Sequence, residues 1–309
     1  MISKREFEIL LNEKFVKEQT KFERVRAITI AWIVVFSCLI IAAAIICHFV
    51  FDPDGEHVLL NILISIALWL GLAIAPTLSF RDKFLKKVKK LDLEQLLEVI
   101  YGDNVEYDSN GNIDKRLFDM SGFFVGAYDK FGGEDHFSVS VSRETPFGVV
   151  STNFEASDVS LEKIEKDKNG ETSKKVFSGV VCAIKFRKPF DCILKMNCAQ
   201  NTKLENLETE SSDFNKIFSP KTDNQVKARL ILSVTMMQTL LDFQAKAKCK
   251  IGLSFVDNYL FVNMNRNLFE FSKKDGNFDF KFVEPIYDDL ALFDALITEI
   301  TNNRKIFRI

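Results

Sequence analysis

The sequence lacks the short signatures that mark many nucleotide-binding and hydrolytic enzymes. It contains no GxxxxGK[ST] phosphate-binding loop, no GxGxxG fingerprint, no GxSxG nucleophile motif and no HExxH zinc motif. Histidine, a frequent proton-transfer group at neutral pH, occurs only three times in 309 residues. The sequence therefore contains no complete catalytic constellation to which a reaction can be assigned.

Cysteine is present without any regular spacing. No CxxC pair occurs among Cys38, Cys47, Cys182, Cys192, Cys198 and Cys249. This pattern is typical of reduced thiols in a cytosolic domain rather than of a disulfide framework or a zinc site. We therefore predict no bound metal and no cofactor.

Charged residues are missing from two long stretches, Ala27 to Phe51 and Val58 to Phe80. Each stretch exceeds the roughly 20 apolar residues that cross a bilayer core. The segment between them is acidic and rich in turn-forming residues. The pattern predicts a transmembrane helical hairpin with a first span at 27–51, an external loop at 52–57 and a second span at 58–80.

Basic residues flank both predicted spans. Before the first span lie Lys4, Arg5, Lys14, Lys17, Lys21, Arg24 and Arg26, and after the second lie Arg81, Lys83, Lys86, Lys87, Lys89 and Lys90. Lys and Arg near span ends favour the cytoplasmic side, so we expect a protein of the inner cell membrane with both termini in the cytoplasm. Residues 1–26 then form a cytoplasmic N-terminal helical segment.

Residues 81–100 are predicted to form a basic juxtamembrane helix. Phe84, Val88 and Leu91 make an apolar stripe at helical spacing. The lysines on another face are candidates for contact with anionic lipid: Lys83, Lys86, Lys87 and Lys90. The alternative is that these lysines only determine the topology, which requires no lipid specificity.

The remaining residues, 101–309, show the mixture of apolar and charged positions that is typical of a globular domain. From Leu91 to Ile309 the sequence has 28 basic and 34 acidic residues, a balance that argues against a nucleic-acid partner. The hydrophobic pattern predicts an α+β cytosolic domain with antiparallel strands. We expect strands at 136–142, 149–156, 176–186, 192–196, 251–256 and 259–265, helices at 114–124, 221–246 and 288–303, and an exposed loop at 161–175.

The segment 221–246 is the clearest predicted helix of this domain. Thr222 and Gln225 fit a capping box at its start. Its buried face is expected to contain the apolar residues that recur at helical spacing: Val226, Leu230, Val234, Met237 and Leu241.

One polar cluster combines carboxylates with the only histidine of the domain. Asp129, Glu134, Asp135 and His136 lie close together in the sequence. Carboxylates and imidazole bind metals or transfer protons, so these residues are a candidate polar site. The alternative is a glycine turn, Gly132-Gly133, that leads into a strand.

A second candidate is basic. Lys227 and Arg229 lie near the start of the predicted helix 221–246, with Asp213 and Asp223 nearby in the sequence. They are candidates for a charged recognition patch. The alternative is a solvated helix surface with local ion pairs.

Several segments of the chain together carry a resemblance to a known family. They are Ser121-Gly122-Phe123-Phe124, Asp129 to Asp135, Phe177-Ser178-Gly179-Val180, Asp213 to Phe218, Asp223 to Leu232, and Leu253 to Asn258. These segments resemble an uncharacterised bacterial family of membrane proteins, the domain of unknown function 3137. The resemblance covers roughly residues 80–270, and it implies paired membrane spans before the domain but no assigned activity. The sequence departs from the family at Ser233-Val234, where members often have Thr-Pro.

The preferred hypothesis is a membrane-anchored protein without enzymatic activity. Its cytosolic domain would bind a partner protein or a small ligand at the inner face of the membrane. The expected partners are then the lipid bilayer and a protein, either a different one or a second copy of this chain. The alternative is a membrane-proximal enzyme that uses the acidic cluster around Glu134, Asp135 and His136.

Overall fold

The computed structural model describes residues 3–51, 93–102, 104–145, 148–167, 170–198, 203–268 and 280–303. The chain divides into two compact units. The first comprises Met1–Phe7, Leu96–Asp275 and Asp279–Ile309, and the second comprises Glu8–Gln95 and Gly276–Phe278.

The first unit is built on an antiparallel sheet of nine strands in the order β1-β2-β3-β4-β9-β8-β5-β7-β6. This arrangement confirms the predicted α+β domain with antiparallel strands. The strands are β1 (Val105–Asp108), β2 (Lys130–Thr145), β3 (Gly148–Asp167), β4 (Gly170–Lys185), β5 (Leu194–Met196), β6 (Glu205–Asn206), β7 (Lys221–Thr222), β8 (Ile251–Val256) and β9 (Tyr259–Met264).

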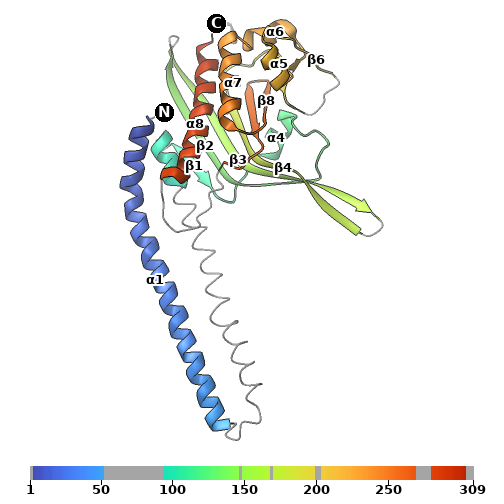
Figure 1. The fold of residues 1–309 in the computed structure, drawn as a ribbon. Coiled ribbons are helices and arrows are strands. Elements are labelled where there is room, and N and C mark those ends of the chain that lie inside the picture. Colours follow the sequence, from blue (N-terminus) through green and yellow to red (C-terminus); the bar gives the residue numbers. More distant parts are fainter. Residues whose placement is uncertain are drawn as a thin grey trace. The chain divides into compact units, whose positions relative to one another are not determined.

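Helices cover both faces of the sheet. On one face, α7 and α8 lie side by side (Figure 1), and the ring of Phe293 packs against Phe154 at 5.6 Å and against Phe243 at 5.5 Å. On the other face, Phe118 of α4 belongs to a buried cluster with Val181 and other apolar residues of the sheet. The described helices are α1 (Lys4–Phe51), α4 (Lys115–Ser121), α5 (Ser212–Phe218), α6 (Gln225–Ile231), α7 (Val234–Ala247) and α8 (Phe280–Asn302).

The first residues of α1 pack on α8 within the first unit. Phe7 is fully buried and its ring stacks on Tyr287 at 4.7 Å. Lys4 forms ion pairs with Glu284 at 2.7 Å and with Asp288 at 3.0 Å. The predicted N-terminal helical segment therefore begins as part of the sheet-containing unit.

Over the side chains that the structure describes, no helix reaches the length and apolarity of a membrane span. The structure therefore does not support the predicted transmembrane hairpin, although α1 does run through residues 27–51 as one helix. Several predicted features lie outside the described residues: the loop 52–57, the second span 58–80 and the lipid-contact candidates Lys83, Lys86, Lys87 and Lys90.

The prediction of an exposed loop at 161–175 is wrong. Strands β3 and β4 continue through this segment as a two-stranded ribbon that projects from the sheet (Figure 1), and Lys166 pairs with Glu171 at 2.6 Å across it. The segment is charged because most of its side chains face solvent. Its backbone groups nevertheless pair with one another, which a hydrophobic pattern cannot report.

The prediction of one helix at 221–246 is also wrong. Residues 221 and 222 form β7, and the helical segment is divided into α6 and α7 at Leu232-Ser233. The Ser233 hydroxyl accepts a hydrogen bond from the Met236 backbone N–H at 3.1 Å and thereby caps a new helix. Because the helix restarts, the predicted buried face is displaced: Val226 and Val234 are exposed, whereas Met236 and Leu240 are buried.

Candidate functional site

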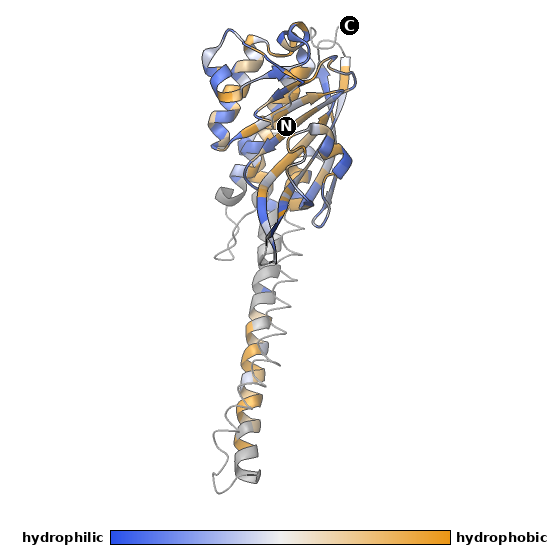
Figure 2. Cartoon of the chain, turned by 90° about the vertical axis from the view of Figure 1, so that its right-hand side faces the viewer, coloured by the Kyte–Doolittle hydropathy of each residue, from blue (hydrophilic) through white to orange (hydrophobic). Residues whose placement is uncertain are grey.

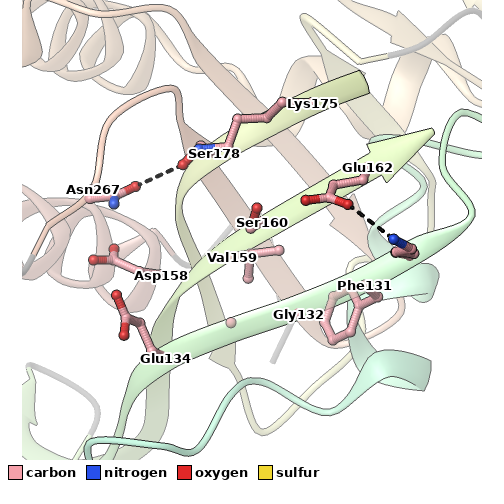
Figure 3. Close-up of a pocket in the computed structure, with 12 residues that line it drawn as sticks. Phe131, Gly132, Glu134, Asp158, Val159, Ser160, Glu162, Lys175, Ser178 and Asn267 are labelled. Atoms are coloured by element: carbon pink, nitrogen blue, oxygen red, sulfur yellow. Dashed lines mark hydrogen bonds and ion pairs between the residues drawn. The ribbon is translucent and has the colours of Figure 1, made fainter. Parts of the chain in front are cut away.

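An open pocket of about 460 Å³ lies over β2, β3 and β4 and the residues that follow β9 (Figure 3). Its size falls in the usual range for small-ligand sites. Most of the residues that line it are polar, in contrast to the apolar core below the sheet. The lining residues are Lys130, Phe131, Gly132, Gly133, Glu134, Asp158, Val159, Ser160, Glu162, Lys175, Ser178 and Asn267.

The strand register explains why these side chains meet. Residues two apart on a strand share a face, and residues paired across strands lie opposite each other. Glu134 pairs with Asp158, Gly132 with Ser160, and Lys130 with Glu162. The middle pair, Gly132 and Ser160, has one side chain that is only a hydrogen atom and one that is small. The wall of the pocket is therefore recessed between the two charged pairs.

Two carboxylates dominate one end of the pocket. Figure 3 shows the side chains of Glu134 and Asp158 next to each other, with Asn267 close by. Asp158 is buried and accepts a hydrogen bond from the Leu268 backbone N–H at 2.9 Å, whereas Glu134 is exposed. This end of the pocket therefore carries concentrated negative charge, part of which is open to a ligand.

The other end of the pocket is closer to neutral. Lys130 lies 3.5 Å from Glu162, and the Ser173 hydroxyl donates a hydrogen bond to Glu162 at 2.5 Å. The hydrogen bond from Ser173 and the positive charge of Lys130 hold the pKa of Glu162 below its ordinary value. Lys175 adds a second positive charge to this part of the lining.

The candidate residues Glu134, Asp135 and His136 do not converge. A β-bulge between Glu134 and Phe137 interrupts the register, and Asp135 takes a left-handed φ of 58°. Glu134 lines the pocket, whereas the carboxylate of Asp135 is buried and accepts a hydrogen bond from the Tyr107 hydroxyl at 2.5 Å. His136 Nε2 lies 3.1 Å from Glu155 instead.

Asp129, the fourth member of the predicted cluster, serves a structural purpose. Its carboxylate accepts a hydrogen bond from the Ile164 backbone N–H at 2.8 Å and pairs with Lys163 at 3.2 Å. Both contacts hold the pKa of Asp129 below its ordinary value. Asp129 also lines a separate pocket of about 380 Å³ around α4, so it contributes nothing to the pocket that contains Glu134. Within the described ranges no three His, Cys, Asp or Glu side chains group as metal ligands.

The candidate recognition residues Lys227 and Arg229 have local partners. Lys227 pairs with Asp191 at 3.2 Å, and the Arg229 guanidinium donates to the Glu208 carbonyl oxygen at 2.9 Å. These contacts connect α6 to neighbouring loops. They fit the alternative of a helix surface with local interactions.

Sequence reasoning missed most of the pocket. It identified Glu134, but Asp158, Ser178 and Asn267 come from three other segments of the chain. The Ser178 hydroxyl donates to the Asn267 side-chain oxygen at 3.4 Å, a contact between residues 89 positions apart. For Ser178 the available signal was the segment Phe177-Ser178-Gly179-Val180, which the resemblance singled out without a chemical role.

The comparisons with known proteins confirm the family resemblance over the C-terminal part of the chain. The family model described as "Protein of unknown function (DUF3137)" matches residues 175–302. Two of the segments that carry the resemblance, 121–124 and 129–135, lie outside that match. A search of curated proteins found no match.

One solved structure with a weak likeness is described as the crystal structure of the mycobacterial trehalose monomycolate transport factor A, TtfA. The sequences are 9% identical, the alignment covers 62% of this chain and 86% of that chain, and the TM-score is 0.34. A likeness at this level supports no inference about fold or function.

Proposed function

We propose that this chain, whose residues 175–302 match a family of unknown function, is a membrane-anchored binding protein that holds a small cationic ligand in the pocket over β2, β3 and β4. The observation that carries the proposal is the pairing of Glu134 with Asp158 at an open, polar pocket. A cation bound there would relieve the repulsion between two adjacent carboxylates.

The character of the lining favours a ligand that also carries hydroxyl groups. Ser160, Ser178 and Asn267 surround the carboxylate end of the pocket and provide hydrogen-bond donors and acceptors. Gly132 leaves room for a ligand because no atom lies within 4 Å of the position that a Cβ would take there. An amino sugar has both the positive charge and the hydroxyl groups that this lining would bind.

The anchor is inferred from residues 27–51 and 58–80, which carry no charged side chain. Along α1, consecutive apolar residues are exposed although they point in different directions: Val34 at 55%, Val35 at 50% and Phe36 at 37%. Figure 2 shows the coloured residues in the C-terminal half of α1 as predominantly hydrophobic. A helix that is apolar on all sides requires a cover, and a lipid bilayer would provide it.

The pocket is tested by titrating the purified full-length chain with glucosamine, with glucose as the uncharged probe of the same shape. We expect saturable binding of glucosamine, and binding of glucose at least about tenfold weaker because it lacks the cation. Glu134→Gln should weaken glucosamine binding by a similar factor. It should not change the melting temperature, because Glu134 is exposed.

The matched control is Glu144→Gln, which removes an exposed carboxylate from the same strand outside the pocket. It should leave the affinity unchanged. Equal binding of glucosamine and glucose, or equal effects of the two substitutions, would refute a cation site at Glu134.

A further inference from the structure

Lys195 is an unusual lysine because most of its side chain is covered. It lies on β5, its exposed fraction is 9%, and it makes no hydrogen bond or ion pair with any residue that the structure describes. Burial lowers the pKa of the Lys195 amine, while the nearby Cys198 thiol opposes that shift. A lysine is rarely buried to this extent unless its charge is compensated.

One neighbour of Lys195 is a buried hydrogen-bond donor that lacks an acceptor among the described residues. Ser254 of β8 pairs with Lys195 in the sheet, is fully buried, and its hydroxyl has no hydrogen-bond partner among the described residues. On the other side, Lys221 of β7 pairs with Lys195. Paired residues share a face of the sheet, so two ammonium groups and one hydroxyl lie on the same face without a described carboxylate to balance them.

Contact with the end of α4 does not account for this arrangement. Lys195 Nζ reaches Gly122, the C-cap of α4, where it would clash with any Cβ. The carbonyl oxygens of Phe118 and Asp119 already accept hydrogen bonds from the Ser121 hydroxyl at 2.6 Å and from the Gly122 N–H at 3.0 Å. The helix is also only seven residues long, so its dipole offers little stabilisation to the Lys195 ammonium.

We propose that Lys195, Lys221 and Ser254 form a binding site for a small anionic group, a phosphate or a carboxylate. The oxygen atoms of such a group accept hydrogen bonds, so the group would supply an acceptor for all three side chains. Lys221 is half-buried and places one side of the site near the solvent. The site lies on the opposite face of the sheet from α7 and α8 and is independent of the pocket at Glu134.

The test is calorimetric titration of the purified full-length chain with inorganic phosphate and, separately, with acetate at constant ionic strength. We expect saturable binding of at least one of these anions. Lys195→Met should weaken that binding by about tenfold or more, because a charge-assisted hydrogen bond is lost. The control Lys216→Met removes an exposed lysine from α5 and should leave the affinity unchanged.

The melting temperature without added anion separates a binding role from a structural one. Lys195→Met keeps the apolar part of the side chain and removes no hydrogen bond or ion pair with a described residue, so it should lower the affinity without lowering the melting temperature. The same is expected of Ser254→Ala, because the Ser254 hydroxyl has no partner among the described residues. Three results would overturn the proposal: no binding of either anion, binding that Lys195→Met does not weaken, or a melting temperature that Lys195→Met lowers.

A second arm distinguishes a soluble ligand from a lipid headgroup. Phosphate binding is compared between lipid discs of pure phosphatidylcholine and discs that also contain phosphatidylglycerol. If phosphatidylglycerol weakens phosphate binding, and this competition disappears in Lys195→Met, the anionic group is a lipid headgroup. Unchanged phosphate binding in both discs assigns it to a soluble ligand.

Discussion

Gly179 and Gly132 are both strand glycines, but only one of them is required by packing. A Cβ at Gly179 would overlap the carbonyl oxygen of Met264 and lie 2.8 Å from the backbone nitrogen of Arg266. At Gly132 no atom lies within 4 Å of the corresponding position. Gly179 therefore permits the close approach of β4 to the end of β9, whereas Gly132 only leaves the pocket open.

We expect Gly179→Ala to lower the free energy of unfolding by about 2–3 kcal/mol, because backbone atoms must move to accommodate the methyl group. Gly132→Ala, the matched control, should change it by less than about 0.5 kcal/mol. Urea denaturation of the two variants provides the comparison. Similar stabilities for both would show that β4 and β9 do not approach as closely as described.

Asp289 of α8 is a buried acid with incomplete pairing. Arg266 donates a hydrogen bond to Asp289 Oδ1, whereas Oδ2 has no partner among the described residues. Burial raises the pKa of Asp289 from 3.8 to about 6, and Arg266 only partly opposes this shift. The folded state therefore binds the proton more tightly than the unfolded state does.

The sign of the pH dependence follows from this difference. Between about pH 4 and 6 the folded protein retains a proton that the unfolded chain has lost, so stability falls as the pH rises. The loss due to Asp289 is on the order of 3 kcal/mol across this window. Asp289→Asn should remove this part of the slope, as measured by denaturation at several pH values. An identical slope in the variant would contradict a raised pKa at Asp289.

The break between α6 and α7 is the clearest feature at the scale of elements. Ser233 has φ −60° and ψ 161°, which is an extended conformation. A residue that precedes a proline favours this conformation, so a proline at position 234 would be compatible with it. Val234 is the first residue of α7 and is 74% exposed. The first position of a helix is where proline fits best, which gives a physical reason for the Thr-Pro that the family resemblance implies at these two positions.

We expect Val234→Pro to be neutral or to stabilise the protein by up to about 1 kcal/mol. Ser233→Ala should cost about 1 kcal/mol because the N-cap hydrogen bond is lost. In a continuous helix over 221–246, the proline would instead cost about 3 kcal/mol or more. Denaturation of both variants thus distinguishes two capped helices from one long helix.

At the scale of the whole molecule, the proposed anchor predicts a topology. Basic residues flank the two charge-free stretches and acidic residues lie between them, so the loop 52–57 should lie outside and both termini in the cytoplasm. Reporter fusions at Gly55 and at Ile309 should give opposite signals. An external signal from the fusion at Ile309 would contradict the proposal.

The sequence by itself determined the helix starts and turns that depend on residues adjacent in the chain. Asp114 accepts hydrogen bonds from Arg116 and Leu117 and begins α4, as expected for an N-cap. Asp257, with φ 53°, turns the chain between β8 and β9, which form where strands were predicted at 251–256 and 259–265. Glu134 was recognised as a candidate because it lies close in the sequence to other carboxylates and to His136, which is visible without a fold.

Only the tertiary structure decided which distant residues meet. Leu268 donates to Asp158 over a separation of 110 positions, and this contact brings the end of β9 to the pocket. Lys195 lies between Ser254 and Lys221 because β5 is inserted between β8 and β7. Strand order and register depend on the packing of the whole sheet, so no local pattern could place these side chains together.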